Sequence, residues 1–145
     1  MIGIVVTGHG LFAVGMQSSA KMIAGENDHI KYVCFEDGMG LEELAVKLNA
    51  AYNELSDCDG IVVLSDLPGG SPFKTAVECS VGHPGKQIVV LSGTNLPMVI
   101  TASTMLSFES DPQALANELL FEGKDNVVRF ELAPCVEIEE EEDGI

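Results

Sequence analysis

Four short apolar runs, each rich in β-branched residues, strongly restrict the folds open to this chain. They cover residues 2–7, 30–35, 60–65 and 87–92, and segments with helical spacing separate them. Strands that are apolar on both faces are typical of a parallel sheet covered by helices on both sides. The sequence therefore predicts an α/β fold with a doubly wound, mainly parallel sheet of strand order 2-1-3-4. Helices are expected at residues 11–24, 42–55, 73–81, 97–106 and 112–121.

Capping residues indicate where some of these helices begin and end. Gly25 is a candidate C-cap of the first helix. Ser71 is a candidate N-cap of the third, with Pro72 at its first helical position. A last strand is expected at residues 126–132. Because it follows two helices in succession, the sequence leaves its direction and its host sheet open.

The charge of the chain is unusual, because 23 acidic residues face only 7 basic ones and give a formal net charge of −16. Nucleic acids and anionic membranes are disfavoured as partners, since both need a basic surface. Two interpretations of the negative charge remain: it attracts a cationic partner, or it only keeps the protein soluble. Part of it lies in residues 137–143, so we expect one domain over residues 1–133 and a solvated acidic tail over 134–145.

Other compositional features point to a cytoplasmic protein with reduced thiols. No apolar run approaches the ~20 residues that span a bilayer, and no signal peptide precedes the first strand. The cysteines, Cys34, Cys58, Cys79 and Cys135, form no CxxC pair and no ligand cluster with the histidines. Most lie in apolar or helical segments, where a free thiol behaves as a small hydrophobe. We expect no metal site and no cofactor.

A histidine between two glycines, Gly8-His9-Gly10, stands where the first strand gives way to a helix. In open α/β sheets, ligands bind beyond the carboxyl ends of the strands where the strand order reverses. With order 2-1-3-4, the loop that begins at Asp66 would face His9 across that crevice. A neutral imidazole is a competent nucleophile near pH 7, and a carboxylate on one ring nitrogen would fix its tautomer.

Backbone N–H groups near this pair could receive phosphoryl oxygens. Gly69, Gly70 and Ser71 supply them at the start of the third helix, and Gly10 leads into the first. Phosphoryl transfer depends mostly on positioning and electrostatics, so this sparse set of groups would suffice. The constellation predicts a phosphohistidine site.

Other interpretations of the same residues stay open. The spacing Gly8-x-Gly10-x-x-Ala13 after a strand also fits a dinucleotide fingerprint, although the chain is short for a complete nucleotide domain. Asp66 could be an ordinary acidic residue in a Pro-Gly turn, and Ser71 a plain helix cap. His29 and His83 are expected to be surface histidines.

Three motifs together resemble the IIA component of the mannose-family sugar phosphotransferase system. They are Gly8-His9-Gly10 after the first strand, Asp66 with Gly-Gly-Ser-Pro-Phe after the third, and Gly-Thr-Asn-Leu-Pro-Met ending at Met98 after the fourth. Two positions depart from the usual pattern. Lys74 stands where asparagine is common, and Leu67-Pro68 varies the residues before Gly-Gly.

The resemblance implies that His9 accepts a phosphoryl group from phospho-HPr and passes it to a histidine of a IIB component. Membrane components IIC and IID would then couple transfer to sugar import. Asp66 would be the hydrogen-bond partner of His9. The resemblance also implies a cytoplasmic homodimer that exchanges its C-terminal strand, which would account for residues 126–132.

Partner docking is expected on the apolar residues near the site, Leu11, Phe12 and Leu67. An acidic acceptor would also attract the basic residues that HPr presents around its own histidine. Two alternatives remain: the phosphocarrier subunit of a phosphoenolpyruvate-dependent dihydroxyacetone kinase, and a dinucleotide-binding or regulatory module. The sequence does not name the sugar.

Overall fold

The computed structural model describes residues 1–134 and confirms the expected alternation of strands and helices. No helix in this part of the chain is long and apolar enough to cross a membrane. In chain order the elements are β1 (Ile2–His9), α1 (Phe12–Ala24), β2 (Ile30–Phe35), α2 (Leu41–Glu54), β3 (Gly60–Ser65), α3 (Ser71–Val81), β4 (Gln87–Leu91), α4 (Leu96–Met105) and α5 (Pro112–Asp125).

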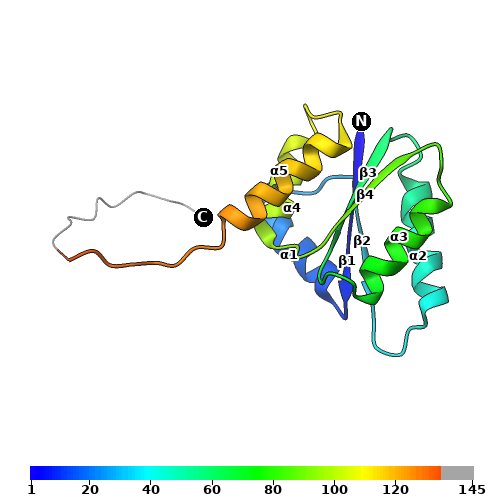
Figure 1. Ribbon diagram of the computed structural model, residues 1–145, viewed down its shortest axis with the longest axis horizontal. Coiled ribbons are helices and arrows are strands. Elements are labelled where there is room, and N and C mark those ends of the chain that lie inside the picture. The colour runs from blue at the N-terminus through cyan, green and yellow to red at the C-terminus, as the bar shows by residue number, and fades with distance from the viewer. Residues whose placement is uncertain (135–145) are drawn as a thin grey trace.

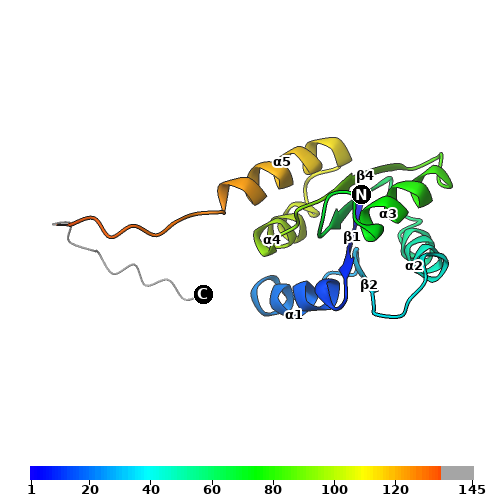
Figure 2. The same ribbon diagram turned by 60° about the horizontal axis from the view of Figure 1, so that its bottom comes forward.

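The four strands form one parallel sheet of order β2-β1-β3-β4, as predicted. Helices α1, α4 and α5 cover one face of this sheet, and α2 and α3 cover the other (Figures 1 and 2). Because all strands are parallel, their carboxyl ends share one edge. Strands β1 and β3 are neighbours there, with Thr7 paired to Ser65. The loops that leave these two strands therefore begin side by side.

The core divides into two apolar clusters, one on each face of the sheet. Successive side chains of a strand point to opposite faces. Ile4 and Val6 of β1 accordingly join the cluster under α1, α4 and α5, whereas Val5 joins Leu44 and Leu48 of α2. These side chains are fully buried, and burial of each stabilises the fold by roughly 1.5–3 kcal/mol. Apart from His9 at the end of β1, the residues of the two central strands are therefore buried.

Helix ends follow local chemistry, with one correction to the sequence-based assignment. Gly25 is the C-cap of α1 as predicted, with a positive φ of 76°. The N-cap of α3, in contrast, is Gly70, which has extended backbone, so Ser71 is already the first helical residue. The prediction of Ser71 as N-cap was wrong by one position. Side chains cap the next two helices, since Asn95 accepts from the Met98 N–H and Asp111 from the Gln113 N–H.

The strand predicted at residues 126–132 is not formed in this chain. Helix α5 continues to Asp125, four residues beyond the predicted end at Phe121. Residues 127–134 then lead away from the body of the fold without regular structure (Figures 1 and 2). Phe130 and Val128 are each 82% exposed. The prediction was wrong for the chain by itself, because a strand needs a neighbour for its backbone N–H and C=O groups.

Candidate active site

His9 is the last residue of β1, at the carboxyl edge of the sheet. Its side chain is 45% exposed. Gly10 follows with a φ of +57°, a conformation that suits glycine, and its N–H donates to the Phe35 carbonyl over 2.7 Å. The Phe35 ring also lies edge-on to the imidazole, with centroids 5.9 Å apart. The end of β2 therefore supports both the turn and the ring, and leaves the imidazole open to solvent.

Asp66 directly follows β3 and holds His9 at two points. Its Oδ2 accepts a hydrogen bond from the His9 backbone N–H over 2.8 Å and lies 2.7 Å from the His9 Nδ1. Its Oδ1 accepts from the Leu67 N–H over 2.8 Å. The Asp66 side chain is only 12% exposed. The predicted facing of His9 and Asp66 across the sheet is thus present in the structure.

Electrostatics keep the Asp66 carboxyl ionised. Burial alone would raise its pKa, but the hydrogen bonds from the His9 backbone, the His9 ring and the Leu67 N–H together hold that pKa below its usual value. An ionised carboxylate can only accept hydrogen bonds. In the neutral ring, Nδ1 therefore carries the proton, and Nε2 keeps a free lone pair.

The start of α3 lies against the other side of the imidazole. A Cβ on Gly70 would come within 3.0 Å of the His9 Cε1, so the absence of a side chain there makes room for the ring. Gly69 has a φ of +71°. No side chain caps the first turn of α3, which leaves the backbone N–H groups of Ser71 and Phe73 without helical partners. Such N–H groups bind anions well.

The loop after β4 braces the Asp66 loop from behind. The Gly93 N–H donates to the Asp66 carbonyl, and the Thr94 N–H to the Ser65 carbonyl, each over 3.1 Å. The Thr94 hydroxyl adds a second hydrogen bond to the Ser65 carbonyl at 2.7 Å. These contacts go to backbone carbonyls, so they fix the position of the Asp66 backbone. The Gly-Thr-Asn-Leu-Pro-Met motif after β4 therefore supports the site and does not carry its chemistry.

The residues predicted for docking have different exposures. Leu11 and Leu67 are 64% and 56% exposed and flank the site. Phe12 is half-buried and packs against the core. A Cβ on Gly8 would come within 2.5 Å of the Phe12 Cδ1, so the aromatic ring occupies the space that Gly8 leaves. Phe12 therefore contributes more to packing than to an exposed surface.

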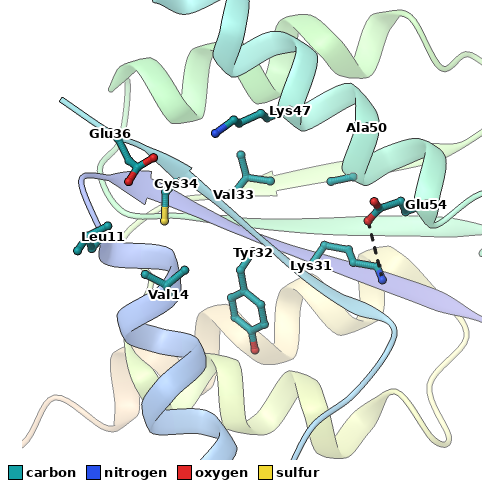
Figure 3. A pocket seen from close by; sticks show the side chains of 11 residues that line it. Leu11, Val14, Lys31, Tyr32, Val33, Cys34, Glu36, Lys47, Ala50 and Glu54 are labelled. Carbon is teal, nitrogen blue, oxygen red and sulfur yellow. Dashed lines mark ion pairs between the residues drawn. The ribbon is translucent and has the colours of Figure 1, made fainter. Parts of the chain in front are cut away.

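A groove beside the site was not foreseen from the sequence. It has a volume of about 440 Å³ and lies between α1 and α2, over the sheet-edge strand β2 (Figure 3). Leu11 stands at its α1 side, and an ion pair between Lys31 and Glu54 crosses it at 3.9 Å. Its residues come from three separate elements, and no local sequence pattern connects them.

The other two histidines lie away from this site. His83 contacts Asn49 at 3.0 Å and lies edge-on to Tyr52. His29 lies near Asp57 and Cys58, with one ligand atom from each residue within 4.8 Å of the others. The expectation that no cysteine clusters with a histidine was therefore wrong. The fold closes a gap of 28 residues that the sequence does not reveal.

Comparison with known proteins identifies the family. A family model described as PTS system fructose IIA component (EIIA-man) matches residues 3–120. The chain belongs to this family.

Individual relatives of the EIIA family agree with this assignment. The mannose-specific EIIAB component of Escherichia coli K12 is 33% identical over 111 residues, which are 77% of this chain and 33% of that protein. The chain thus spans about a third of the length of this relative. The EIIA crystal structure from Streptococcus agalactiae has a TM-score of 0.82 at 32% identity and covers 89% of this chain and 97% of its own. The mannose/sorbose IIA subunit of Enterococcus faecalis has a TM-score of 0.81 at 29% identity, covering 92% and 98%.

Proposed function

We propose that this EIIA chain is a phosphohistidine carrier of sugar uptake, with His9 as the residue that is phosphorylated. The observation that carries the proposal is the geometry of the His9–Asp66 pair. A nearly buried carboxylate holds Nδ1 at 2.7 Å, and the ring is 45% exposed. In that tautomer the Nε2 lone pair is the nucleophile, and the approach to it is open.

The reaction is an exchange of one nitrogen–phosphorus bond for another. His9 Nε2 attacks the phosphorus of a phosphohistidine on HPr, and the bond to the donor imidazole breaks as the new bond forms. The donor nitrogen recovers its electron pair. Asp66 offsets the positive charge that develops on the His9 ring, because its carboxylate stays on the Nδ1 proton. The same steps in reverse order deliver the group to a IIB histidine.

Oxygen atoms of the phosphoryl group would be held by the backbone. The proposed donors are the N–H groups of Gly69 and Ser71 and those that follow Gly10 at the start of α1. The N–H groups of Gly10 and Gly70 themselves already donate to the carbonyls of Phe35 and Leu67. Gly10 and Gly69 have the positive φ values that open such turns, and Ser71 begins a helix without a side-chain cap. A helix N-terminus favours an anion by hydrogen bonds and by its dipole. Since the proposed donors belong to the backbone, no metal ion is needed to hold the group.

Docking of the donor would use the exposed apolar residues Leu11 and Leu67, with acidic residues around them. Glu36 and Asp37 follow β2 on the same edge and are exposed. Long-range attraction raises the association rate and falls with salt. Lysine at both positions should therefore weaken the salt dependence of transfer. Glu118→Lys on α5, away from the loops of that edge, is the matched control and should change it less.

A homodimer with an exchanged C-terminal segment is part of the proposal. Among the described residues of one chain, no strand pairs with residues 127–132. Val128, Phe130 and Leu132 nevertheless alternate as a strand requires and are all more than 70% exposed. Strand β4 lies at a sheet edge, and its residues 88–90 are only half-buried. Truncation after Asn126 should convert a dimer to a monomer in light scattering. A dimer that survives truncation would contradict the exchange.

A single assay tests the carrier function. The chain is incubated with labelled phosphoenolpyruvate, Enzyme I and HPr, and the product is tested for an acid-labile, base-stable phosphoryl group. Wild type should be labelled and His9→Ala should not. His83→Ala is the matched control and should keep the label. An unlabelled wild type would contradict the carrier function, and label in His9→Ala would contradict the site.

A second experiment identifies the protein that accepts the phosphoryl group from this chain. Purified labelled chain is mixed either with a IIB component or with the nucleotide-bearing component of a dihydroxyacetone kinase. Transfer to IIB is the expected result. Loss of label only to the kinase component would assign the chain to dihydroxyacetone phosphorylation instead.

We further propose that residues 1–133 form the carrier domain and residues 134–145 an acidic tail; the part beyond Pro134 lies outside the described residues.

A further inference from the structure

The amino edge of the sheet, opposite the His9 edge, brings a second group of reactive side chains together. His29 directly precedes β2, and Asp57 and Cys58 lie in the loop before β3. Strand β1 runs between these two strands, so both loops flank Met1, which directly precedes it. The phosphocarrier mechanism uses none of these residues.

Three different ligand atoms converge at this edge. The His29 Nε2 lies 3.8 Å from one carboxylate oxygen of Asp57, and the Cys58 Sγ lies 3.8 Å from the other. All three groups offer a ligand atom within 4.8 Å of the others. In a tetrahedral zinc site with bonds of about 2.0–2.3 Å, neighbouring ligand atoms are separated by roughly 3.3–3.8 Å. The two 3.8 Å contacts use different Asp57 oxygens, so side-chain rotations are needed to bring one oxygen, the nitrogen and the sulfur to this spacing.

We propose that His29, Asp57 and Cys58 bind a borderline divalent cation, with Zn²⁺ as the best match. Imidazole nitrogen and thiolate sulfur favour zinc over magnesium or calcium, which prefer oxygen ligands. On binding, the Cys58 thiol loses its proton to solvent and the His29 ring binds in its neutral form. Three protein ligands leave a fourth position for water.

Backbone hydrogen bonds already fix the residues that carry the ligands. The His29 carbonyl accepts from the Ile4 N–H of β1 over 2.8 Å. The Cys58 N–H donates to the Leu55 carbonyl over 3.0 Å, and the Lys86 ammonium binds the carbonyls of both Leu55 and Cys58 at 2.6 and 2.8 Å. Only side-chain rotations are then needed to form the site, which lowers the entropic cost of binding.

Neighbouring charges nearly balance around the proposed ion. The Met1 ammonium group pairs with the Asp59 carboxylate over 2.7 Å, and Lys86 faces the Asp57–Cys58 loop through its carbonyl contacts. These two cations oppose a metal ion. The Asp57 and Asp59 carboxylates supply two negative charges against them, so the local charge is balanced before a divalent cation arrives. Release of the Cys58 thiol proton on metal binding adds one negative charge.

Access to the site comes from the His29 side. His29 lines an open cavity of about 250 Å³ together with Met1 and Asn27. The Asp57 side chain is 66% exposed, whereas Cys58 is only 3% exposed. An ion can therefore approach through the imidazole and the carboxylate, and the sulfur closes the site from the protein side.

The test uses full-length, reduced protein after removal of any affinity tag. Co²⁺ is added first, because a thiolate ligand gives a strong charge-transfer absorption band, and Zn²⁺ is then used to displace it. Wild type should bind one ion per chain and show the band. Cys58→Ser should abolish the band, and Asp57→Asn and His29→Asn should each weaken Zn²⁺ binding at least about tenfold.

Matched controls separate this site from the rest of the chain. Cys34→Ser, Cys79→Ser and Cys135→Ser together should retain the band, because Cys58 is then the remaining thiol. His9→Ala should also retain it, which excludes the other histidine–carboxylate pair. Loss of the band in either control, its survival in Cys58→Ser, or no binding by wild type would overturn the proposal. Asp57 is exposed, so unchanged affinity in a folded Asp57→Asn would overturn it as well.

Discussion

Two histidine–aspartate pairs lie at opposite edges of one sheet, and their geometries differ sharply. At the carboxyl edge, His9 and Asp66 are 2.7 Å apart and the Asp66 side chain is 12% exposed. At the amino edge, His29 and Asp57 are 3.8 Å apart and the Asp57 side chain is 66% exposed. Backbone N–H groups hold the carboxylate of the first pair. The second pair instead has a buried thiol beside it.

The difference shows that burial and backbone contacts decide what a histidine–aspartate pair can do. A carboxylate fixed by the backbone gives its histidine one tautomer and one orientation, which suits a nucleophile. A freely exposed carboxylate with a sulfur nearby provides separate ligand atoms that can close around an ion. On these proposals, identical residue types serve group transfer at one edge and metal binding at the other.

The largest expected difference between the edges is in phosphoryl transfer. Asp66→Asn should slow transfer from phospho-HPr to His9 roughly 10²–10⁴-fold, because an amide cannot offset the charge on the ring. Asp57→Asn should change the rate less than about twofold, since it lies at the other edge. Rapid-quench labelling measures both rates. Equal slowing of the two variants would remove the distinction between the pairs.

The second difference is in stability. Lys86→Met should lower the free energy of unfolding by about 1–3 kcal/mol, because two carbonyls of the amino-edge loop lose a charged donor. Transfer should be unchanged. Lys74→Met, on the exposed side of α3, is the matched control and should stay within about 0.5 kcal/mol of wild type. Urea titration measures these values, and a stable Lys86→Met would contradict the bracing role.

A smaller effect tests how closely the carboxyl edge fits its imidazole. Gly70→Ala would place a methyl group 3.0 Å from the His9 Cε1. Displacement of the ring by a few tenths of an ångström should slow transfer about tenfold while the fold persists. Gly15→Ala on α1, where the added methyl meets open space, should leave transfer unchanged. Normal transfer in Gly70→Ala would show that the ring tolerates movement.

The smallest effect is the pH dependence of stability at the carboxyl edge. The pKa of Asp66 is lowered in the folded chain, so its stabilising contribution is complete above the unfolded value of about 3.9 and is lost as the pH falls through the folded value. The difference in unfolding free energy between wild type and Asp66→Asn should therefore shrink in acid. A difference that persists down to about pH 2 would contradict this sign.

Sequence patterns were sufficient to predict the sheet and the proximity of His9 to Asp66. The alternation of apolar runs predicted a doubly wound parallel sheet. Order 2-1-3-4 was expected because short sheets of this kind prefer it, and that order places His9 beside Asp66. His9 ends one β-branched strand and Asp66 directly follows its neighbour, so the topology alone brings them together. The family assignment is consistent with the same motifs.

Features that depend on distant residues were not predictable in the same way. His29 was expected to be an isolated surface histidine, because nothing in the local sequence connects it with Cys58. Residues 126–132 have the composition of a strand, but strand formation requires a neighbouring strand, and none pairs with them within residues 1–134. Ser71 was misplaced by one position because glycine can also occupy an N-cap, and Gly70 does so here.

The uncovered segment after α5 has a consequence for the lifetime of the protein. Val127, Val128, Phe130 and Leu132 are all more than 70% exposed in the single chain. Proteases cleave extended, exposed segments most readily. If the C-terminal segment is exchanged in a dimer as proposed above, a dimeric subunit buries this segment and a monomeric subunit leaves it exposed. Proteolysis would then remove monomeric subunits selectively, and the steady-state concentration of the protein would depend on the rate of dimerisation.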